Sequence, residues 1–368
     1  MRIIRTPTDH GERFDLLDDA DQPLPLVASF ALGLQARGCS PNTIIAYLYD
    51  LRRFYQFLDN AGLSIEHVVA AHTVDFLAYL NALQPRQRKI TVFPTVVRTG
   101  LSPTTINRVL AAVSTFFEHL VLTGVEGVMN NPLDVSAGNG RLGQPRRPAR
   151  RLKRLRRIHR IPRPLSDEQV TRLLEVMDRP RDRAMFLLML QGGLRPSEVL
   201  NLHLDDVEYG RRRVTVRYRT DHPKGVRTKS RTERVVDLYE PDALAAVSAY
   251  VMNERPFQAP TRHLFLVCGK GPRATDPIGY PALAKLFERR RDEAGLTEPW
   301  ITPHALRHTH ATRLWEGGMR ELALQKRLGH ASFESTRAYT RVSDAMMLED
   351  YQRALTALKE RKTHATRG

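Results

Sequence analysis

The chain has 368 residues, of which 42% are hydrophobic and 26% charged, and this ordinary globular composition suits two domains. Its formal net charge of +17 indicates a polyanionic partner, because an excess of this size steers a protein towards nucleic acid. The two cysteines, Cys39 and Cys268, offer neither a disulfide framework nor a metal set, and no apolar run approaches the ~18 residues of a membrane span.

The N-terminal extension, residues 1 to 23, is highly charged and lacks the apolar core of a signal peptide, which favours a soluble, cytoplasmic protein. Residues 24 to 136 then predict a small all-α domain. One helix is predicted over residues 27 to 35 and another over residues 68 to 83. Two longer helices are predicted to start at residues 41 and 103. Two of them open with the same Ser-Pro-x-Thr-Ile sequence, since Ser is a favoured N-cap and Pro costs little at the first helical position.

The helix that starts at residue 41 carries an apolar stripe with a period of 3.6 residues. The stripe includes Ile44, Leu48 and Leu51. Asp50, Arg52 and Arg53 lie away from most of it. This pattern predicts one buried helix face and, by itself, indicates only a helical bundle.

Two basic segments are candidates for contact with an anionic partner. The first is a long loop, residues 84 to 100, for which DNA contact and simple solvation are both open. Its basic residues include Arg86, Arg88 and Lys89. The second is an interdomain linker, residues 137 to 163, in which eleven Arg or Lys and no acid carry +11 of the +17. Such a density of like charge extends a chain, so the linker either is solvated or contacts phosphates. Its candidate contact residues are Arg150, Arg151, Lys153 and Arg154.

Residues 164 to 349 predict an α+β domain that is mainly helical and contains a small sheet. Ser166 is the N-cap of its first helix, residues 183 to 191 predict a buried helix, and residues 280 to 294 predict another. Residues 214 to 218 and 233 to 238 predict a β-hairpin with a charged tip. The C-terminal tail, residues 350 to 368, has too few apolar residues to bury itself well.

The segment from Ile301 predicts an anion site on a helix. Thr302 can cap this helix, and Pro303 fits its first turn. His304 and Arg307 are three residues apart, so they share a face within the first two turns. The unpaired amides and the helix dipole favour an anion there. This arrangement predicts a phosphate site.

Further candidate residues follow at fixed intervals. A helix with Leu322, Leu324 and Leu328 stops at Gly329, and His330 lies in the turn after it. Tyr339 comes nine residues later on a predicted short helix. Considered alone, such a Tyr is more often a half-buried packing residue than a nucleophile, and an Arg in a basic chain usually lies on the solvated surface. His304 and His308 could suggest a metal, but the Glu of a metalloprotease motif and a nearby Cys are absent.

The combined order His304-x-x-Arg307, Leu328-Gly329-His330 and Tyr339 resembles the C-terminal signature of the tyrosine recombinases, the phage integrase family. Residues 192 to 200 are similar to the first arginine motif of that family, with Arg195 as the arginine and Glu198 as the supporting acid. Residues 228 to 236 resemble the hairpin that carries the family's lysine, here Lys229. Lys224 is a rival for that role, because the interval between Arg195 and Lys229 is longer than in compact members.

The resemblance implies a two-domain DNA clamp. Residues 24 to 136 would be the helical, SAM-like core-binding domain and residues 164 to 349 the catalytic domain. A linker between two halves of a clamp crosses the DNA, so we favour phosphate contact by its arginines and lysines. The tail resembles the segment that packs on a neighbouring protomer, which implies a homo-tetramer on two duplexes of the recombination site. Accessory recombination proteins are further expected partners.

The resemblance also implies a reaction without ATP, metal or cofactor. Tyr339 would attack the scissile phosphate and form a 3′-phosphotyrosyl link. The expected catalytic residues are Arg195, Lys229, His304, Arg307, His330 and Tyr339. Two alternatives share most of these features: a type IB topoisomerase, which relaxes DNA without exchanging strands, and a catalytically silent DNA-binding relative. The sequence leaves open the recombination site and whether the DNA served is a phage, a transposon, an integron or the host chromosome, although the long basic linker favours a mobile element.

Overall fold

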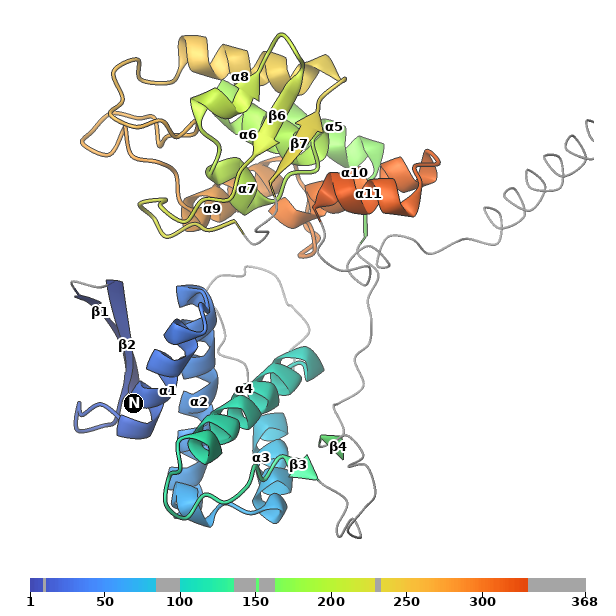
Figure 1. Cartoon of the computed structure of the whole chain (residues 1–368). Coiled ribbons are helices and arrows are strands. Elements are labelled where there is room, and N and C mark those ends of the chain that lie inside the picture. Colours follow the sequence, from blue (N-terminus) through green and yellow to red (C-terminus); the bar gives the residue numbers. More distant parts are fainter. Residues whose placement is uncertain (9–10, 84–99, 136–149, 152–162, 229–232, 330–368) are drawn as a thin grey trace, which may run out of the picture. The chain divides into compact units, whose positions relative to one another are not determined.

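The computed structural model describes residues 1–8, 11–83, 100–135, 150–151, 163–228 and 233–329 (Figure 1). The chain divides into two compact units, Met1–His159 and Arg160–Gly368, and each is described by itself. Among these described residues, no helix is both long and apolar enough to cross a membrane.

Helices dominate the first unit, as the sequence predicts. They are α1 (Pro25–Ala36), α2 (Pro41–Ala61), α3 (Ala70–Ala82) and α4 (Pro103–Leu122), with a 3₁₀ turn at Ile65–His67. The side chains of Ser40 and Ser102 each accept a hydrogen bond of 3.2 Å from a backbone N–H three residues ahead. The repeated Ser-Pro opening therefore gives the same N-cap on α2 and α4, which confirms the predicted capping chemistry.

Aromatic side chains hold the four helices together. The ring of Phe54 on α2 lies edge-on to Phe76 of α3 and Phe117 of α4, at centroid distances of 5.1 and 5.8 Å. Phe30 of α1 meets Phe116 of α4 at 5.3 Å. All five rings are almost completely buried, so they form one core between the helices.

A β-hairpin precedes the helices, where the sequence predicts only an extension. Strand β1 (Arg2–Thr8) pairs with β2 (Gly11–Leu17) in antiparallel register. Phe14 and Leu16 of β2 point to one side and join the core of the helices. Two alternating apolar residues among many charges are a weak signal, which is why the strand is hard to predict. A second short pair joins β3 (Asp134–Val135) to β4 (Arg150–Arg151).

The second unit combines helices with one small sheet. Its helices are α5 (Asp167–Glu175), α6 (Pro180–Leu190), α7 (Pro196–Leu200), α8 (Pro241–Asn253), α9 (Tyr280–Glu293), α10 (Pro303–Glu316) and α11 (Glu321–Leu328). The sheet is antiparallel in the order β5 (Val207–Glu208), β6 (Arg213–Val216) and β7 (Arg234–Asp237). The predicted hairpin is confirmed as β6 and β7, and β5 extends it by one strand.

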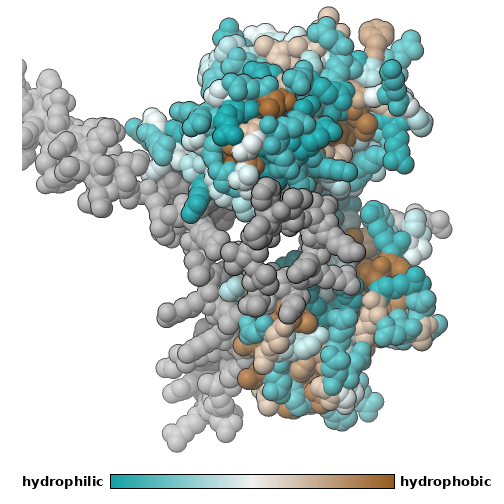
Figure 2. Space-filling view, turned by 180° about the vertical axis from the view of Figure 1, so that it is seen from behind, coloured by the Kyte–Doolittle hydropathy of each residue, from teal (hydrophilic) through white to brown (hydrophobic). Residues whose placement is uncertain are grey.

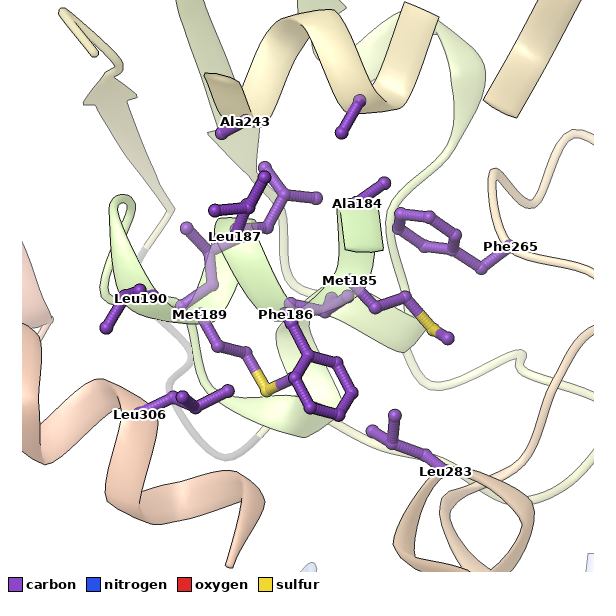
Figure 3. Close-up of a cluster of buried hydrophobic side chains, with 14 of the residues drawn as sticks. Ala184, Met185, Phe186, Leu187, Met189, Leu190, Ala243, Phe265, Leu283 and Leu306 are labelled. Carbon is purple, nitrogen blue, oxygen red and sulfur yellow. The ribbon is translucent and has the colours of Figure 1, made fainter. Parts of the chain in front are cut away.

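Helix α6 forms the centre of this unit. Its residues from Ala184 to Leu190 are all buried, so this part of the helix is covered on every side. Phe186 stacks on Phe287 of α9 with ring centroids 4.8 Å apart. Figure 3 shows Leu283 and Leu306, from α9 and α10, beside the side chains of α6. The predicted buried helix is confirmed.

Mostly hydrophilic residues cover the visible face of the second unit (Figure 2).

Two local expectations near the C-terminal helices are wrong. Thr302 is at the N-cap position of α10, but its side chain makes no capping hydrogen bond. The sequence places Leu322 on the apolar face of α11, yet its exposed fraction is 66%, whereas Leu324 and Leu328 are buried. The short α11 packs on α10 through these two leucines and Ala311. The side chain of Leu322 in the first turn of α11 therefore faces solvent.

Candidate active site

The centre of the candidate site is Glu198, whose side chain is completely buried in the first turn of α7. Arg195 precedes the helix, and its backbone N–H donates to Glu198 Oε2 at 2.8 Å. The guanidinium of the same residue donates from Nη1 to Oε1 at 2.7 Å. The three-residue spacing in the Arg195-Pro-Ser-Glu198 sequence thus lets one carboxylate cap the helix and hold the arginine.

Arg234 at the start of β7 binds the same carboxylate. Its Nη1 and Nη2 donate to Oε1 and Oε2 of Glu198 at 2.9 and 2.7 Å, in the parallel two-bond geometry that guanidinium and carboxylate groups favour. Sequence reasoning placed Arg234 only in a strand and missed this role. The Arg-Val-Val-Asp sequence of β7 does not alternate between apolar and polar residues, so no local signal shows that Arg234 shares the face of the buried Val236.

Arg307 of α10 completes the cluster. Its side chain is buried, and Nη1 lies 3.7 Å from Glu198 Oε2. The same Nη1 donates to the backbone oxygen of Gly193 at 2.6 Å, and Nη2 donates to that of Leu328 at 2.6 Å. Arg307 therefore connects α10 to the turn before α7 and to the end of α11.

The carboxylate of Glu198 is ionised at any ordinary pH. Burial by itself would raise its pKa, but the hydrogen bonds and charge of Arg234, with the charges of Arg307 and Arg195, lower the pKa to about 2. Three guanidinium groups against one carboxylate leave a formal charge of +2. Arg195 is the most accessible of the three, with 15% of its side chain exposed. The cluster is suited to an anion such as a phosphate group.

The three arginines also bind the end of α11. Arg234 Nε donates to the carbonyl of Arg327 at 2.9 Å, Arg307 to that of Leu328, and Arg195 Nη2 to that of Gly329 at 3.0 Å. Three successive carbonyls at the C-terminus of a helix lack helical partners, and here each accepts from a different arginine. The backbone that leads into residue 330 is therefore fixed to the Glu198 cluster.

Histidines surround this cluster in different settings. His304 is exposed in the first turn of α10, one turn before Arg307. His310 is buried, with Nδ1 2.9 Å from the carbonyl of Leu190 and Nε2 accepting from Arg327 Nε at 3.1 Å. Burial and the charge of Arg327 lower the pKa of His310 to about 3. Within the described ranges, no three His, Cys, Asp or Glu side chains form a group that could hold a metal ion.

The structure brings together only part of the predicted set. Arg195, Glu198 and Arg307 converge, and His304 lies on the same helix as Arg307. Lys229, His330 and Tyr339 lie outside the described residues. The rival lysine, Lys224, is described, and its Nζ forms an ion pair of 2.8 Å with Asp276.

Most of the predicted DNA-contact residues lie outside the described part of the chain. These are Arg86, Arg88, Lys89, Lys153 and Arg154. The backbone of Arg150 and Arg151 is described and pairs with Val135 and Asp134. The linker therefore contributes the short strand β4, which pairs with β3 at the end of the segment that precedes it.

Comparison with known proteins identifies the family. The model of the phage integrase family matches residues 163–346, which is half of the chain, and that of its N-terminal SAM-like domain matches residues 27–124. Tyrosine recombinase XerC from Pelobacter propionicus is 30% identical over 343 residues, or 90% of this chain and 96% of the relative. Transposase A from transposon Tn554 of Staphylococcus aureus is 27% identical over 361 residues, with 95% of both chains covered.

Solved structures show the same fold. The integrase of transposon Tn1549, in complex with transposon right end DNA, superposes with a TM-score of 0.67 at 20% identity, covering 90% of this chain and all of that one. The XerH recombinase bound to its difH substrate gives a TM-score of 0.60 at 19% identity, covering 89% of this chain and 84% of that one. The chain belongs to the phage integrase family. It is a tyrosine recombinase, an enzyme that cleaves and rejoins DNA strands in site-specific recombination.

Proposed function

We propose that this recombinase moves or excises a mobile element by exchanging strands at the ends of that element. The observation that carries the chemistry is the buried carboxylate of Glu198 with three arginines around it, which leaves net positive charge for a phosphate. The similarity to the Tn554 transposase over 95% of both chains favours a transposon-like element. The protein would act as a homo-tetramer on two duplexes, with accessory proteins as further partners.

In the proposed reaction, the hydroxyl of Tyr339 attacks the scissile phosphorus. A bond forms between the tyrosine oxygen and phosphorus, while the bond from phosphorus to the 5′-oxygen breaks. His304 takes the proton from Tyr339, whose ordinary pKa near 10 makes it a poor nucleophile. Lys229 donates a proton to the departing 5′-oxygen. Attack by the 5′-hydroxyl of a second cleaved strand reverses these steps and joins the exchanged strands.

The arginines stabilise the negative charge that develops on the non-bridging oxygens of the phosphate. Arg195 and Arg307 present planar sets of donors and stay protonated at every working pH, so they bind the non-bridging oxygens. His330 would donate a further hydrogen bond to the same oxygens. Since Glu198 holds both arginines in place, no reorganisation is needed when the charge forms. The chemistry proposed for these side chains requires no metal or cofactor.

A covalent-adduct assay tests this function. The substrate is labelled duplex DNA from the regions that flank the gene, with nicks that trap cleavage. The full chain is expected to form a protein–DNA adduct that resists denaturant, also in the presence of a chelator. Tyr339→Phe should abolish this adduct and leave DNA binding nearly unchanged. Tyr351→Phe is the matched control and should behave like the parent.

The outcomes separate the alternatives. Binding without any adduct would indicate a catalytically silent relative. An adduct and plasmid relaxation without recombinant product would indicate a topoisomerase. An adduct that persists in Tyr339→Phe would show that another residue is the nucleophile, and loss of cleavage in the chelator would revive a metal-dependent reaction through the histidines.

A further inference from the structure

Arg234 forms more bonds inside the arginine cluster than its role as a strand residue requires. Two of its nitrogens bind both oxygens of Glu198, and the third binds the carbonyl of Arg327. Only 7% of this side chain is exposed. A guanidinium whose three nitrogens are all engaged inside the protein is suited to holding other groups in place.

Gly329 shows how closely Arg234 packs on the end of α11. Gly329 has a φ of +61°, the left-handed conformation that glycine adopts without strain. A Cβ added there would lie 2.8 Å from Nη1 and 3.1 Å from Cζ of Arg234. The guanidinium therefore occupies the space that any other side chain would need. Gly329 directly precedes His330 in the sequence, so Arg234 packs against the residue from which the chain continues to His330.

The same contacts connect Arg234 to the two phosphate-binding arginines. Arg195 and Arg307 both depend on Glu198, and each also binds a carbonyl of the chain end that Arg234 holds. Loss of Arg234 would leave both oxygens of a buried carboxylate with fewer donors. Arg195 would then be drawn further towards Glu198, and the end of α11 would lose one of its three anchors.

Resting on the proposed function, we propose that Arg234 is a positioning residue for DNA cleavage, which fixes Glu198 and the chain entering residue 330 in the geometry that the reaction needs. It does not touch the phosphate. It acts through Arg195, Arg307 and the backbone of Gly329. Its removal should therefore lower the rate of cleavage far more than the affinity for DNA.

The test compares Arg234→Gln and Arg234→Lys with Arg213→Gln. Arg213 is the matched control, because it lies on the neighbouring strand β6 and pairs with Glu208 at 3.4 Å near the surface. The probe is the nicked duplex from the DNA that flanks the gene. The single-turnover rate of adduct formation and the affinity for this duplex are measured as functions of pH.

We expect Arg234→Gln to slow adduct formation by about 100-fold, the effect of a small misplacement of reacting groups, with little change in affinity. Without the hydrogen bonds and charge of Arg234, less opposes the effect of burial on Glu198, so the pKa of Glu198 rises. The rate of this variant should consequently fall as pH decreases, in a limb that the parent lacks. Arg234→Lys keeps the charge but not the two-bond geometry, so its rate of adduct formation should lie between those of Arg234→Gln and the parent. Arg213→Gln should match the parent.

Three results would overturn the inference. The first is a parental rate in Arg234→Gln, and the second is an equal loss of rate and affinity. The third is a loss of rate without the acid limb, which a purely structural role would give. If Arg234→Gln does not fold, as judged by circular dichroism, the rate and pH profile of Arg234→Lys decide by the same criteria. A parent that forms no adduct would instead contradict the proposed function.

Discussion

Arg108 of α4 forms an ion pair of 2.8 Å with Asp50 of α2, whose carboxylate is completely buried. Arg53, one turn along α2, binds the same oxygen at 3.0 Å. Burial raises the pKa of Asp50, while the charges of Arg108 and Arg53 lower it. The pair joins the two helices that share the Ser-Pro opening, so a charged contact is part of the core of the first unit.

Removing Arg108 should weaken this contact between α2 and α4. Arg108→Met leaves a buried carboxylate with one partner, and we expect a loss of about 1–3 kcal/mol in the stability of the two helices. Hydrogen exchange of the α2 and α4 amides in the full chain measures it. Arg5→Met, which removes an exposed pair with Glu12, should have almost no effect. Asp50→Asn should restore much of the protection in Arg108→Met, and a failure to do so would show that the charge is not responsible.

Asp50 also shows where the sequence stops being informative in the first unit. The helices and their N-caps depend on residues within four positions of each other, so local patterns predict them. The position of Asp50 off the apolar stripe suggested the polar side of α2, and that expectation is wrong. Its partner Arg108 is 58 residues away, and nothing local to Asp50 reveals that a charge from α4 compensates it.

The active site likewise contains contacts that the local sequence predicts and contacts that it does not. Arg195 and Glu198 are three residues apart, and their contact follows from the helix start between them. The convergence of Arg307 on Glu198 was expected only through the family motif. The three carbonyls at the end of α11 and the role of Arg234 arise from tertiary packing. The sequence of β7, Arg-Val-Val-Asp, does not alternate, so it reveals neither the burial of the Arg234 side chain nor its partner.

His310 predicts an acid-dependent loss of stability in the second unit. In the folded chain its pKa is about 3, whereas the ordinary value is 6.5. Between these values the unfolded chain binds a proton that the folded chain does not, so stability is present above pH 6.5 and is lost as pH falls towards 3. His308, with a pKa lowered to about 4 by burial, acts in the same direction.

Tryptophan fluorescence can measure this loss, because both tryptophans, Trp300 and Trp315, lie in the second unit. The concentration of guanidinium chloride at which half of the protein is unfolded, the midpoint, should be lower at pH 5 than at pH 7. His310→Gln should lower the midpoint at pH 7, since the bonds to Leu190 and Arg327 change, and should reduce its dependence on pH. An unchanged dependence would mean that His310 has the same pKa in the folded and the unfolded chain.

The basic linker predicts a change in the salt dependence of binding. Neutralising Arg150, Arg151, Lys153 and Arg154 together should weaken binding to cognate and to random duplexes by similar factors. The slope of log affinity against log salt should become shallower by roughly 0.9 for each phosphate that the linker no longer neutralises. Fluorescence anisotropy at several salt concentrations measures both quantities. A selective loss on the cognate duplex with an unchanged slope would instead indicate base contacts.

The two lysines of the β6–β7 connection predict opposite results. Lys224 pairs with Asp276, which occupies its charged end, so Lys224→Ala should cleave DNA at close to the parental rate. Lys229→Ala should be almost inactive, because it removes the acid for the 5′-oxygen and acid catalysis contributes roughly 10²–10⁴-fold. Single-turnover cleavage of the flanking duplex compares the two variants directly.

A duplex with sulfur at the 5′-bridging position then identifies the acid. A thiolate departs without a proton, so this substrate should restore cleavage to Lys229→Ala. It should not restore cleavage to Arg195→Ala or Arg307→Ala, since these arginines serve the non-bridging oxygens, which are unchanged. Rescue of a defective Lys224→Ala, with Lys229→Ala active on ordinary DNA, would exchange the two roles. The ion pair with Asp276 would then have to open before each cleavage, and Asp276→Asn would accelerate the reaction.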